Sequence, residues 1–311
     1  MLPVAAAAAA AVVACLLWRY QLPAGAQPAL PGDVPAGHST VSLPSTGPTR
    51  YRLSDGPGRV VVLVHGISYP MEVYSMLFDS LTSRGHAVLS YDITGRGYSH
   101  SSGAPMTLNH LVQQLEELLS VLQLDDRQLD LVGWSMGGVI ASSYAVRHPS
   151  RIARLALIAP PGATPPMKPL SAKLLLLPLV GNALAGVFVP SALRSLYARE
   201  LEHHTDGGRM LAFLCDHATR NRALPRAIIS ALRDLPELDD HTAVYTALDP
   251  SSLPILVVWG TQDDTVDRRA VEALMAQLGA HARLHVVEGE RHSLLLTASA
   301  KVNPELARFV E

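Results

Sequence analysis

The chain has 311 residues, of which 48% are apolar and 17% are charged, and its formal net charge at pH 7 is −2. An α/β domain with an insertion reaches this length, and the absence of a basic excess argues against a protein that binds nucleic acid. The two cysteines, Cys15 and Cys215, exclude a disulfide framework and a zinc site built from cysteines.

An uncharged apolar run, Leu2–Trp18, begins the chain and is followed by Arg19. It is at the lower limit of about 17 residues for crossing a bilayer. It is interpreted as a signal anchor, which would associate the protein with a membrane, or as a signal peptide cleaved near residues 24–26, which would lead to secretion. An organelle transit segment is a third interpretation. We assign residues 1–26 to this segment, and residues 27–49, rich in Pro, Gly, Ala and Ser, to a linker.

Strand and helix signals alternate from Arg50 onward. The β-branched run 59–65 is typical of a central parallel strand that is buried on both faces. Further strands are expected at 87–91, 128–132, 152–158, 255–259 and 283–287. Helices are expected at 71–84, 108–122, 136–147, 268–278 and 294–310. This alternation predicts an α/β protein with a doubly wound, mostly parallel sheet.

The alternation stops in residues 161–250, which contain proline clusters and amphipathic helices without a clear strand. We interpret this segment as a helical insertion that divides the core into residues 50–160 and 251–311. The apolar stretch 174–189 is too short to span a bilayer. It is expected to pack on the core as a cap helix or, alternatively, to form an acyl-chain pocket or a membrane-facing lid.

A G-x-S-x-G pattern, Gly133 to Gly137, lies between an expected strand and an expected helix. A tight strand-to-helix turn strains its central residue and requires small residues on both sides of it. Such a turn lifts the Ser135 hydroxyl clear of the sheet. It also brings the Met136 N–H to a helix N-terminus, where it can face a developing oxyanion. The pattern therefore predicts Ser135 as a nucleophile.

This segment resembles the nucleophile elbow of the α/β-hydrolase superfamily. Four other segments resemble motifs of that family in the expected order, over about residues 50–311. They are His65-Gly66, the D-x-x-G-x-G-x-S loop Asp92–Ser99, the W-G-x-x-D segment Trp259–Asp263 and the G-x-x-H loop Gly289–His292. The resemblance implies an α/β-hydrolase fold with a helical cap inserted between strands 6 and 7.

A serine hydroxyl needs a base to take its proton, and the family order is Ser, then Asp or Glu, then His. His292 follows the last expected strand, in a loop that can reach the carboxyl edge of the sheet. The spacing from Trp259 favours Asp263 as the acid, with Asp264 as the alternative. Asp267 is expected to be a helix N-cap. The predicted triad is therefore Ser135, Asp263 and His292.

The loop after the expected strand 59–65 should supply a second oxyanion donor beside the Met136 N–H. The His-Gly match implies that this donor is the Ile67 backbone N–H. His65 itself is expected to be a buried structural imidazole that bonds loop backbone, and Asp92 is expected to stabilise a turn. No cofactor and no metal are expected.

The sequence predicts a serine hydrolase that cleaves carboxylic esters, lipid or small acyl esters, through an acyl-enzyme. The Ser-Met-Gly-Gly elbow resembles that of monoglyceride lipases. Trp134, in the position before the serine where those lipases usually have a histidine, resembles the elbow of small carboxylesterases. One alternative is an aminopeptidase of the proline-iminopeptidase type, in which Glu200 or Glu202 of the cap would hold the substrate amine. Another is a binding protein that has kept the fold without the chemistry. The sequence indicates no oligomeric state.

Overall fold

The computed structural model describes residues 37–161, 177–202, 204, 207–235, 242–248 and 253–311. The expected signal segment, residues 1–26, lies outside the described residues. The described residues contain an eight-stranded sheet in the order β1-β2-β4-β3-β5-β6-β7-β8. Its strands are β1 (Ser39–Leu43), β2 (Gly47–Ser54), β3 (Val60–Val64), β4 (Ala87–Tyr91), β5 (Leu129–Trp134), β6 (Ile152–Ile158), β7 (Ile255–Gly260) and β8 (Ala282–Val287).

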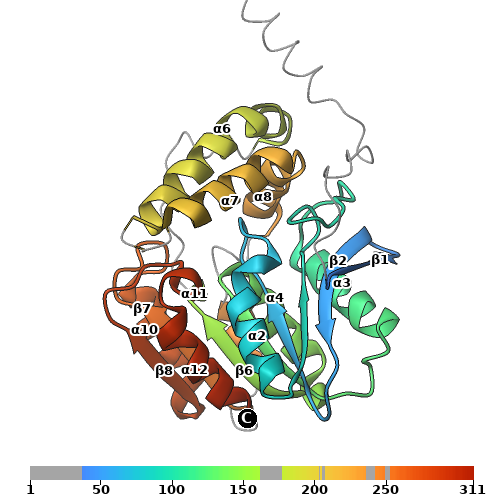
Figure 1. The fold of residues 1–311 in the computed structure, drawn as a ribbon, viewed down its shortest axis with the longest axis vertical. Helices are drawn as coiled ribbons and strands as arrows, with labels where there is room; N and C mark the ends of the chain where they lie inside the picture. The colour runs from blue at the N-terminus through green and yellow to red at the C-terminus, as the bar shows by residue number, and fades with distance from the viewer. Residues whose placement is uncertain (1–36, 162–176, 203, 205–206, 236–241, 249–252) are drawn as a thin grey trace, which may run out of the picture.

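The six strands β4, β3, β5, β6, β7 and β8, in sheet order, pair in parallel. β2 pairs antiparallel with both β1 and β4. Helices lie on both faces of this sheet (Figure 1). The helices and short 3-10 turns of the core are η1 (Met71–Tyr74), α2 (Ser75–Ser83), α3 (Leu108–Val121), α4 (Met136–Arg147), η2 (Pro149–Arg151), α9 (Thr242–Thr246), α10 (Arg268–Leu278), η4 (Gly279–His281), α11 (Leu294–Thr297) and α12 (Ser299–Val310). The α/β-hydrolase fold expected from the sequence is confirmed.

Both faces of β3 are buried, and alternate side chains enter two different cores. Val62 and Val64 pack with α3 and α4 in one core, and Val61 and Leu63 pack with α2 and α12 in the other. A strand covered on both faces has no polar alternation, which explains the continuous apolar run in the sequence.

The expected linker is wrong for residues 39–49, because β1 and the start of β2 lie there. These strands form the antiparallel edge of the sheet. β1 is mostly exposed, so it lacks the apolar run that marks the central strands. A contact distant in sequence holds the turn between them, since the backbone N–H and Oγ of Ser45 both donate to Glu117, at 2.9 and 2.8 Å.

The described part of the expected insertion contains four helices: the short α9, which packs on α4 and α10, and the longer α6 (Pro178–Glu200), α7 (Gly207–Arg220) and α8 (Leu224–Asp234). Figure 1 shows α6, α7 and α8 as a separate group above the sheet. Their buried side chains, such as Val189, Leu214 and Ile228, share one apolar core with β6 and α11. The described part of the insertion therefore packs on the core as a cap, as expected, while residues 174–176 of the expected apolar helix lie outside the described residues.

A hydrogen bond from the Tyr245 hydroxyl to the Pro161 carbonyl, at 3.3 Å, joins the two ends of the insertion. Across the described ranges, no helix combines the length and the apolar character needed to cross a bilayer. Two expected helices are interrupted: η1 precedes α2, and Ala298 separates α11 from α12.

Candidate active site

Ser135 lies between the end of β5 and the start of α4, in a strained backbone conformation with φ 53° and ψ −123°. The flanking glycines make this turn possible. A Cβ on Gly137 would overlap the Val64 carbonyl of the neighbouring strand, and a Cβ on Gly133 would overlap the Gly137 carbonyl. A non-glycine residue is tolerated in such a conformation only where the surrounding structure holds it there, which is common at functional sites.

His292 and Asp263 lie together, as the sequence predicts. Nδ1 of His292 is 2.9 Å from Oδ2 of Asp263, whose side chain is fully buried. The other carboxylate oxygen accepts the backbone N–H groups of Thr265 and Val266 at 2.9 and 2.8 Å. The carboxylate is therefore fixed in position and oriented toward the imidazole.

The two other aspartates near this strand end have different environments. Asp264 is partly exposed and pairs with Arg199 and Arg291, at 3.1 and 3.5 Å, rather than with an imidazole. Asp267 is the N-cap of α10 and accepts the Ala270 N–H at 2.8 Å, as expected. The geometry therefore favours Asp263 over Asp264 as the partner of His292.

The loop that carries His292 lies beside the nucleophile elbow. The indole N–H of Trp134, the residue before Ser135, donates to the His292 carbonyl at 3.2 Å. The two rings are 5.8 Å apart between centroids. At Gly260 a Cβ would overlap the Glu290 carbonyl, so a glycine is needed there for the loop to pass the end of β7. These contacts bring the three predicted triad residues to the carboxyl edge of the sheet.

The loop after β3 passes close to Ser135, since a Cβ on Gly66 would lie 3.4 Å from the Ser135 Cβ. His65 is fully buried, with Nδ1 2.8 Å from the Gly66 carbonyl and Nε2 accepting the Ile93 N–H at 2.9 Å. This arrangement requires a neutral imidazole protonated on Nδ1. Burial, above all, lowers the pKa of His65 to about 3, so it is neutral at physiological pH. The structural role expected for His65 is confirmed.

This imidazole also orients the expected oxyanion donor. The Gly66 carbonyl and the Ile67 N–H belong to one peptide group, and no described peptide bond is cis. In a trans peptide group the C=O and N–H point in opposite directions. Holding the carbonyl on His65 therefore directs the Ile67 N–H away from it. The other expected donor, the Met136 N–H, is the first of α4 and has no acceptor within its own helix.

The surroundings of His292 favour its protonated form. Burial by itself lowers the pKa of His292, but the charge of Asp263 and its hydrogen bond outweigh burial. Glu200 and Asp264 add smaller contributions, and the pKa is raised above its ordinary value. The same Asp263 carboxylate would stabilise the imidazolium that forms when a serine proton is taken up.

The cap contributes a carboxylate at this point. Glu200, at the end of α6, is buried, and its Oε2 accepts the N–H of Ser293 at 2.9 Å. Its other oxygen, Oε1, is buried without a hydrogen-bond partner among the described residues. Glu202, the second candidate from the sequence, is exposed. The structure therefore brings Glu200, and not Glu202, next to the His292 loop.

Three aromatic side chains join the cap to the core beside the elbow, and two of them, Tyr69 and Tyr197, belong to no recognised motif. The Tyr69 ring lies 4.6 Å from that of Trp134 and 5.0 Å from that of Tyr197, a residue of α6. The hydroxyl of Tyr197 donates to the Ser68 carbonyl at 2.6 Å, and that of Tyr69 is 2.9 Å from the Ser293 hydroxyl. These contacts link α6 to the loops after β3 and β8.

A second group of buried polar residues surrounds Asp92, the first residue of the D-x-x-G-x-G-x-S loop. Its carboxylate accepts the N–H groups of Met71 and Tyr98 and pairs with Arg50 at 2.7 Å, so the expected turn-stabilising role is confirmed.

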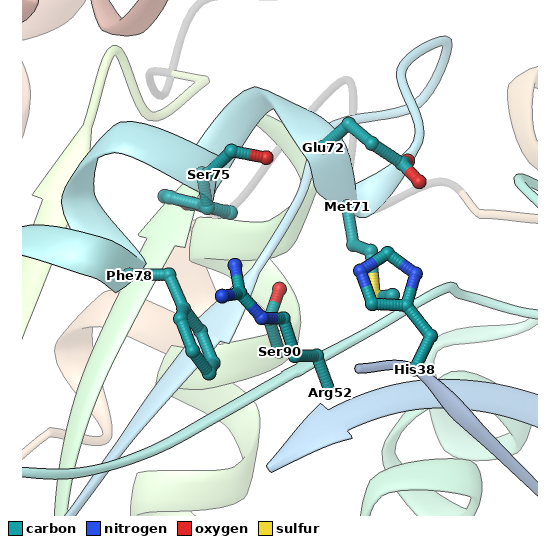
Figure 2. A pocket seen from close by; sticks show the side chains of 8 residues that line it. His38, Arg52, Met71, Glu72, Ser75, Phe78 and Ser90 are labelled. Atoms are coloured by element: carbon teal, nitrogen blue, oxygen red, sulfur yellow. The ribbon is translucent and has the colours of Figure 1, made fainter. Parts of the chain in front are cut away.

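A small pocket lies near Asp92, between β2, β4 and α2 (Figure 2). Figure 2 labels seven of the residues that line it: His38, Arg52, Met71, Glu72, Ser75, Phe78 and Ser90. None of them belongs to the predicted triad. Within the described ranges, no group of His, Cys, Asp or Glu side chains is arranged to hold a metal ion.

The fold and the elbow define an α/β hydrolase. The chain belongs to the family described as "Serine aminopeptidase, S33", whose profile matches residues 55–297. It is 26% identical to monoacylglycerol lipase abhd6-B of Xenopus laevis, over 78% of this chain and 72% of that protein. It is 29% identical to the pimeloyl-[acyl-carrier protein] methyl ester esterase of Aeromonas hydrophila, over 82% of this chain and 96% of that protein.

Solved structures share the fold. The enol-lactonase of Burkholderia xenovorans superposes with a TM-score of 0.73 at 20% identity, covering 88% of this chain and 99% of the other. An esterase from Exiguobacterium antarcticum superposes with a TM-score of 0.71, also at 20% identity, covering 88% and 98%. At this level of identity the likeness shows the architecture.

Proposed function

We propose that this hydrolase cleaves carboxylic esters through a Ser135–His292–Asp263 triad. The observation that carries the proposal is the 2.9 Å contact between His292 and a fully buried Asp263, beside the strained Ser135 elbow. In the first step, Ser135 Oγ attacks the ester carbonyl while His292 Nε2 takes its proton. The alcohol then leaves with that proton. Water, activated by the same imidazole, hydrolyses the acyl-serine and releases the acid.

The oxyanion of both tetrahedral intermediates would be bound by the N–H groups of Ile67 and Met136. The first is oriented by His65, and the second lies at the N-terminus of α4, where the helix dipole favours negative charge. Donors that are held in position before the substrate binds need little reorganisation during the reaction.

An apolar acyl group suits the surroundings of the site. Aliphatic side chains of the cap, including Ala185, Leu193 and Leu201, pack in the same apolar core as Trp134, the residue before Ser135. Two relatives are named for ester cleavage, a monoacylglycerol lipase and a methyl ester esterase. These observations support small acyl or lipid esters as the substrate class.

A substrate panel tests this proposal directly. We expect the purified protein to hydrolyse p-nitrophenyl esters of short and medium acyl chains and to leave aminoacyl-naphthylamides intact. Labelling of Ser135 by a fluorophosphonate probe should accompany this activity. Folded protein that hydrolyses no substrate and takes up no probe would instead support a binding protein without chemistry.

An aminopeptidase is the second candidate, because Glu200 is buried beside the His292 loop and its Oε1 accepts no hydrogen bond among the described residues, with Arg199 Nη2 3.8 Å away. A carboxylate in this position could pair with the α-amine of a peptide substrate. In that case Glu200→Gln would raise KM for aminoacyl-naphthylamides strongly. The matched variant Glu202→Gln, at an exposed position, would change it little. Inactivity of the parent protein toward all such substrates would exclude this function.

The value of kcat/KM for ester hydrolysis should rise once as the pH increases from acidic to neutral. Only the neutral imidazole accepts the Ser135 proton, so kcat/KM should increase as His292 deprotonates. Because the pKa of His292 is raised, the midpoint should lie above the ordinary value of about 6.5. Glu200→Gln removes one of the charges that raise this pKa and should move the midpoint to lower pH. Glu202→Gln should leave it in place, and a flat profile between pH 5 and 8 would contradict a histidine base.

The amino-terminal run, Leu2–Trp18, is proposed to direct the protein to a membrane or to the secretory pathway. As an anchor, it should keep the full-length chain with membranes after a carbonate wash; as a signal peptide, it should be absent from the mature protein. A chain that begins near Pro28 keeps every described strand and every predicted site residue, since β1 starts at Ser39. We therefore expect it to be active without the run. A full-length chain that retains Met1 and fractionates with cytosolic proteins would contradict the proposal.

A further inference from the structure

Arg96 carries a buried positive charge with no carboxylate partner among the described residues. Its side chain is fully buried, and its guanidinium is held by neutral acceptors. Nε donates to the Ile67 carbonyl at 3.1 Å, and Nη2 donates to the Ala227 carbonyl at 3.2 Å. Nη1 donates to the Thr94 carbonyl at 2.9 Å and to Met106 Sδ at 3.4 Å. Buried charges are normally paired, because desolvation is costly, so an unpaired one calls for a functional reason.

The charge lies at the loop that would bind the oxyanion. Arg96 contacts Ile67, whose N–H is a proposed oxyanion donor, and the preceding residue, Gly66, adjoins Ser135. The field of Arg96 reaches this loop, because after burial it is among the charges that lower the pKa of His65. Burial also lowers the pKa of Arg96 to about 9, which leaves the guanidinium charged at neutral pH.

The Ile67 loop is therefore held from two sides. His65 binds the carbonyl of Gly66, and Arg96 binds the carbonyl of Ile67, the next one along the chain. With both carbonyls fixed, the peptide group that carries the Ile67 N–H has little freedom to turn away from the site. Preorganised donors of this kind are the largest electrostatic contribution in many enzymes.

We propose that Arg96 is a positioning residue for oxyanion stabilisation: it fixes the Ile67 loop and adds a buried positive charge beside the developing negative charge. This inference rests on the proposed serine-hydrolase function. Arg96 acts through Ile67 and touches no substrate. In a buried site the attraction between its charge and the oxyanion is weakly screened, and it becomes important only when the oxyanion forms.

The same guanidinium also connects the cap to this loop. Its Nη2 binds a carbonyl of α8, and the Asn221 side chain, also in the cap, donates to the Gly97 carbonyl at 2.9 Å. At Gly95 a Cβ would lie only 2.7 Å from the Ala227 Cβ, so the loop and α8 are in close contact. The packing of α8 on this loop thus supplies one of the carbonyl acceptors, that of Ala227, that hold Arg96 beside Ile67.

The experiment compares Arg96→Met, which removes the charge, with Arg96→Lys, which keeps it without the planar fork. We expect Arg96→Met to lower kcat by about 10²-fold with KM little changed, and Arg96→Lys to lower it less. Phenylboronic acid forms an anionic tetrahedral adduct with a serine, so its inhibition constant should rise by the same factor as kcat falls. Each rate is normalised to the fraction of sites titrated by a fluorophosphonate.

Arg59→Met is the matched control, since Arg59 is a partly buried arginine that pairs with Asp130 and Val310, outside the proposed site. It should leave kcat and boronate affinity unchanged. Should Arg96→Met fail to fold, Arg96→Lys decides alone, with parallel losses in kcat and boronate affinity expected. Unchanged kcat and boronate affinity per titrated site, or a loss confined to KM, would overturn the inference. Full activity of Ser135→Ala would instead refute the underlying function.

Discussion

Ser135→Ala is expected to abolish turnover and fluorophosphonate labelling. The change removes only Oγ, the atom that would form the acyl-enzyme, so the loss in kcat should be on the order of 10⁶. Ser135 is nearly buried, at 8% exposure, and alanine fits the same space. The variant should therefore fold normally, as checked by circular dichroism and thermal melting.

Ser135→Gly provides a control for the strain in the elbow. At φ 53° and ψ −123°, a residue with a Cβ is strained by about 1–3 kcal/mol, and glycine is not. We expect the glycine variant to be as inactive as the alanine variant but to melt at a higher temperature. Activity of more than a few per cent in either variant would refute Ser135 as the nucleophile.

Asp263→Asn is expected to lower kcat by about 10⁴-fold while leaving the fold intact. The asparagine oxygen can still accept the N–H groups of Thr265 and Val266, which directs the amide NH₂ toward His292 Nδ1. Nδ1 must then accept a hydrogen bond rather than donate one. The proton moves to Nε2, and the imidazole can no longer act as a base toward Ser135.

The matched control is Asp264→Asn at the neighbouring position. Asp264 is partly exposed and pairs with two arginines, and such ion pairs contribute at most about 1 kcal/mol. We expect a small change in thermal stability and less than about a tenfold change in kcat. The reverse ranking of the two variants would move the acid to Asp264.

The parts of the fold that could be predicted from the sequence are those with a local signature. β3 is a continuous apolar run because it is buried on both faces, and the elbow glycines have no room for a Cβ. The Asp263–His292 contact joins two short motifs 29 positions apart, and each can be recognised by itself. Their catalytic roles stay predictions that the variants above test.

The parts that could not be predicted depend on contacts between distant segments. In the β1–β2 hairpin, β1 is mostly exposed and has no apolar run, and Glu117 of α3 holds the turn. Glu200 and Glu202 look alike in the sequence, and only the packing of α6 buries one and exposes the other. Arg96 has no carboxylate partner among the described residues, and one of its acceptors is a carbonyl of the distant helix α8, which no local pattern indicates.

The cap and the predicted triad occupy separate stretches of the chain, so the cap can change while the triad residues stay the same. The predicted nucleophile precedes the insertion and the predicted acid and base follow it, while the bond from Tyr245 to Pro161 brings the ends of the insertion together. Exchange of the whole cap between related hydrolases would thus leave all three predicted triad residues in the chain. Two contacts would have to be preserved in such a chimaera: a carboxylate that accepts the Ser293 N–H, as Glu200 does, and a backbone carbonyl for Arg96, as at Ala227.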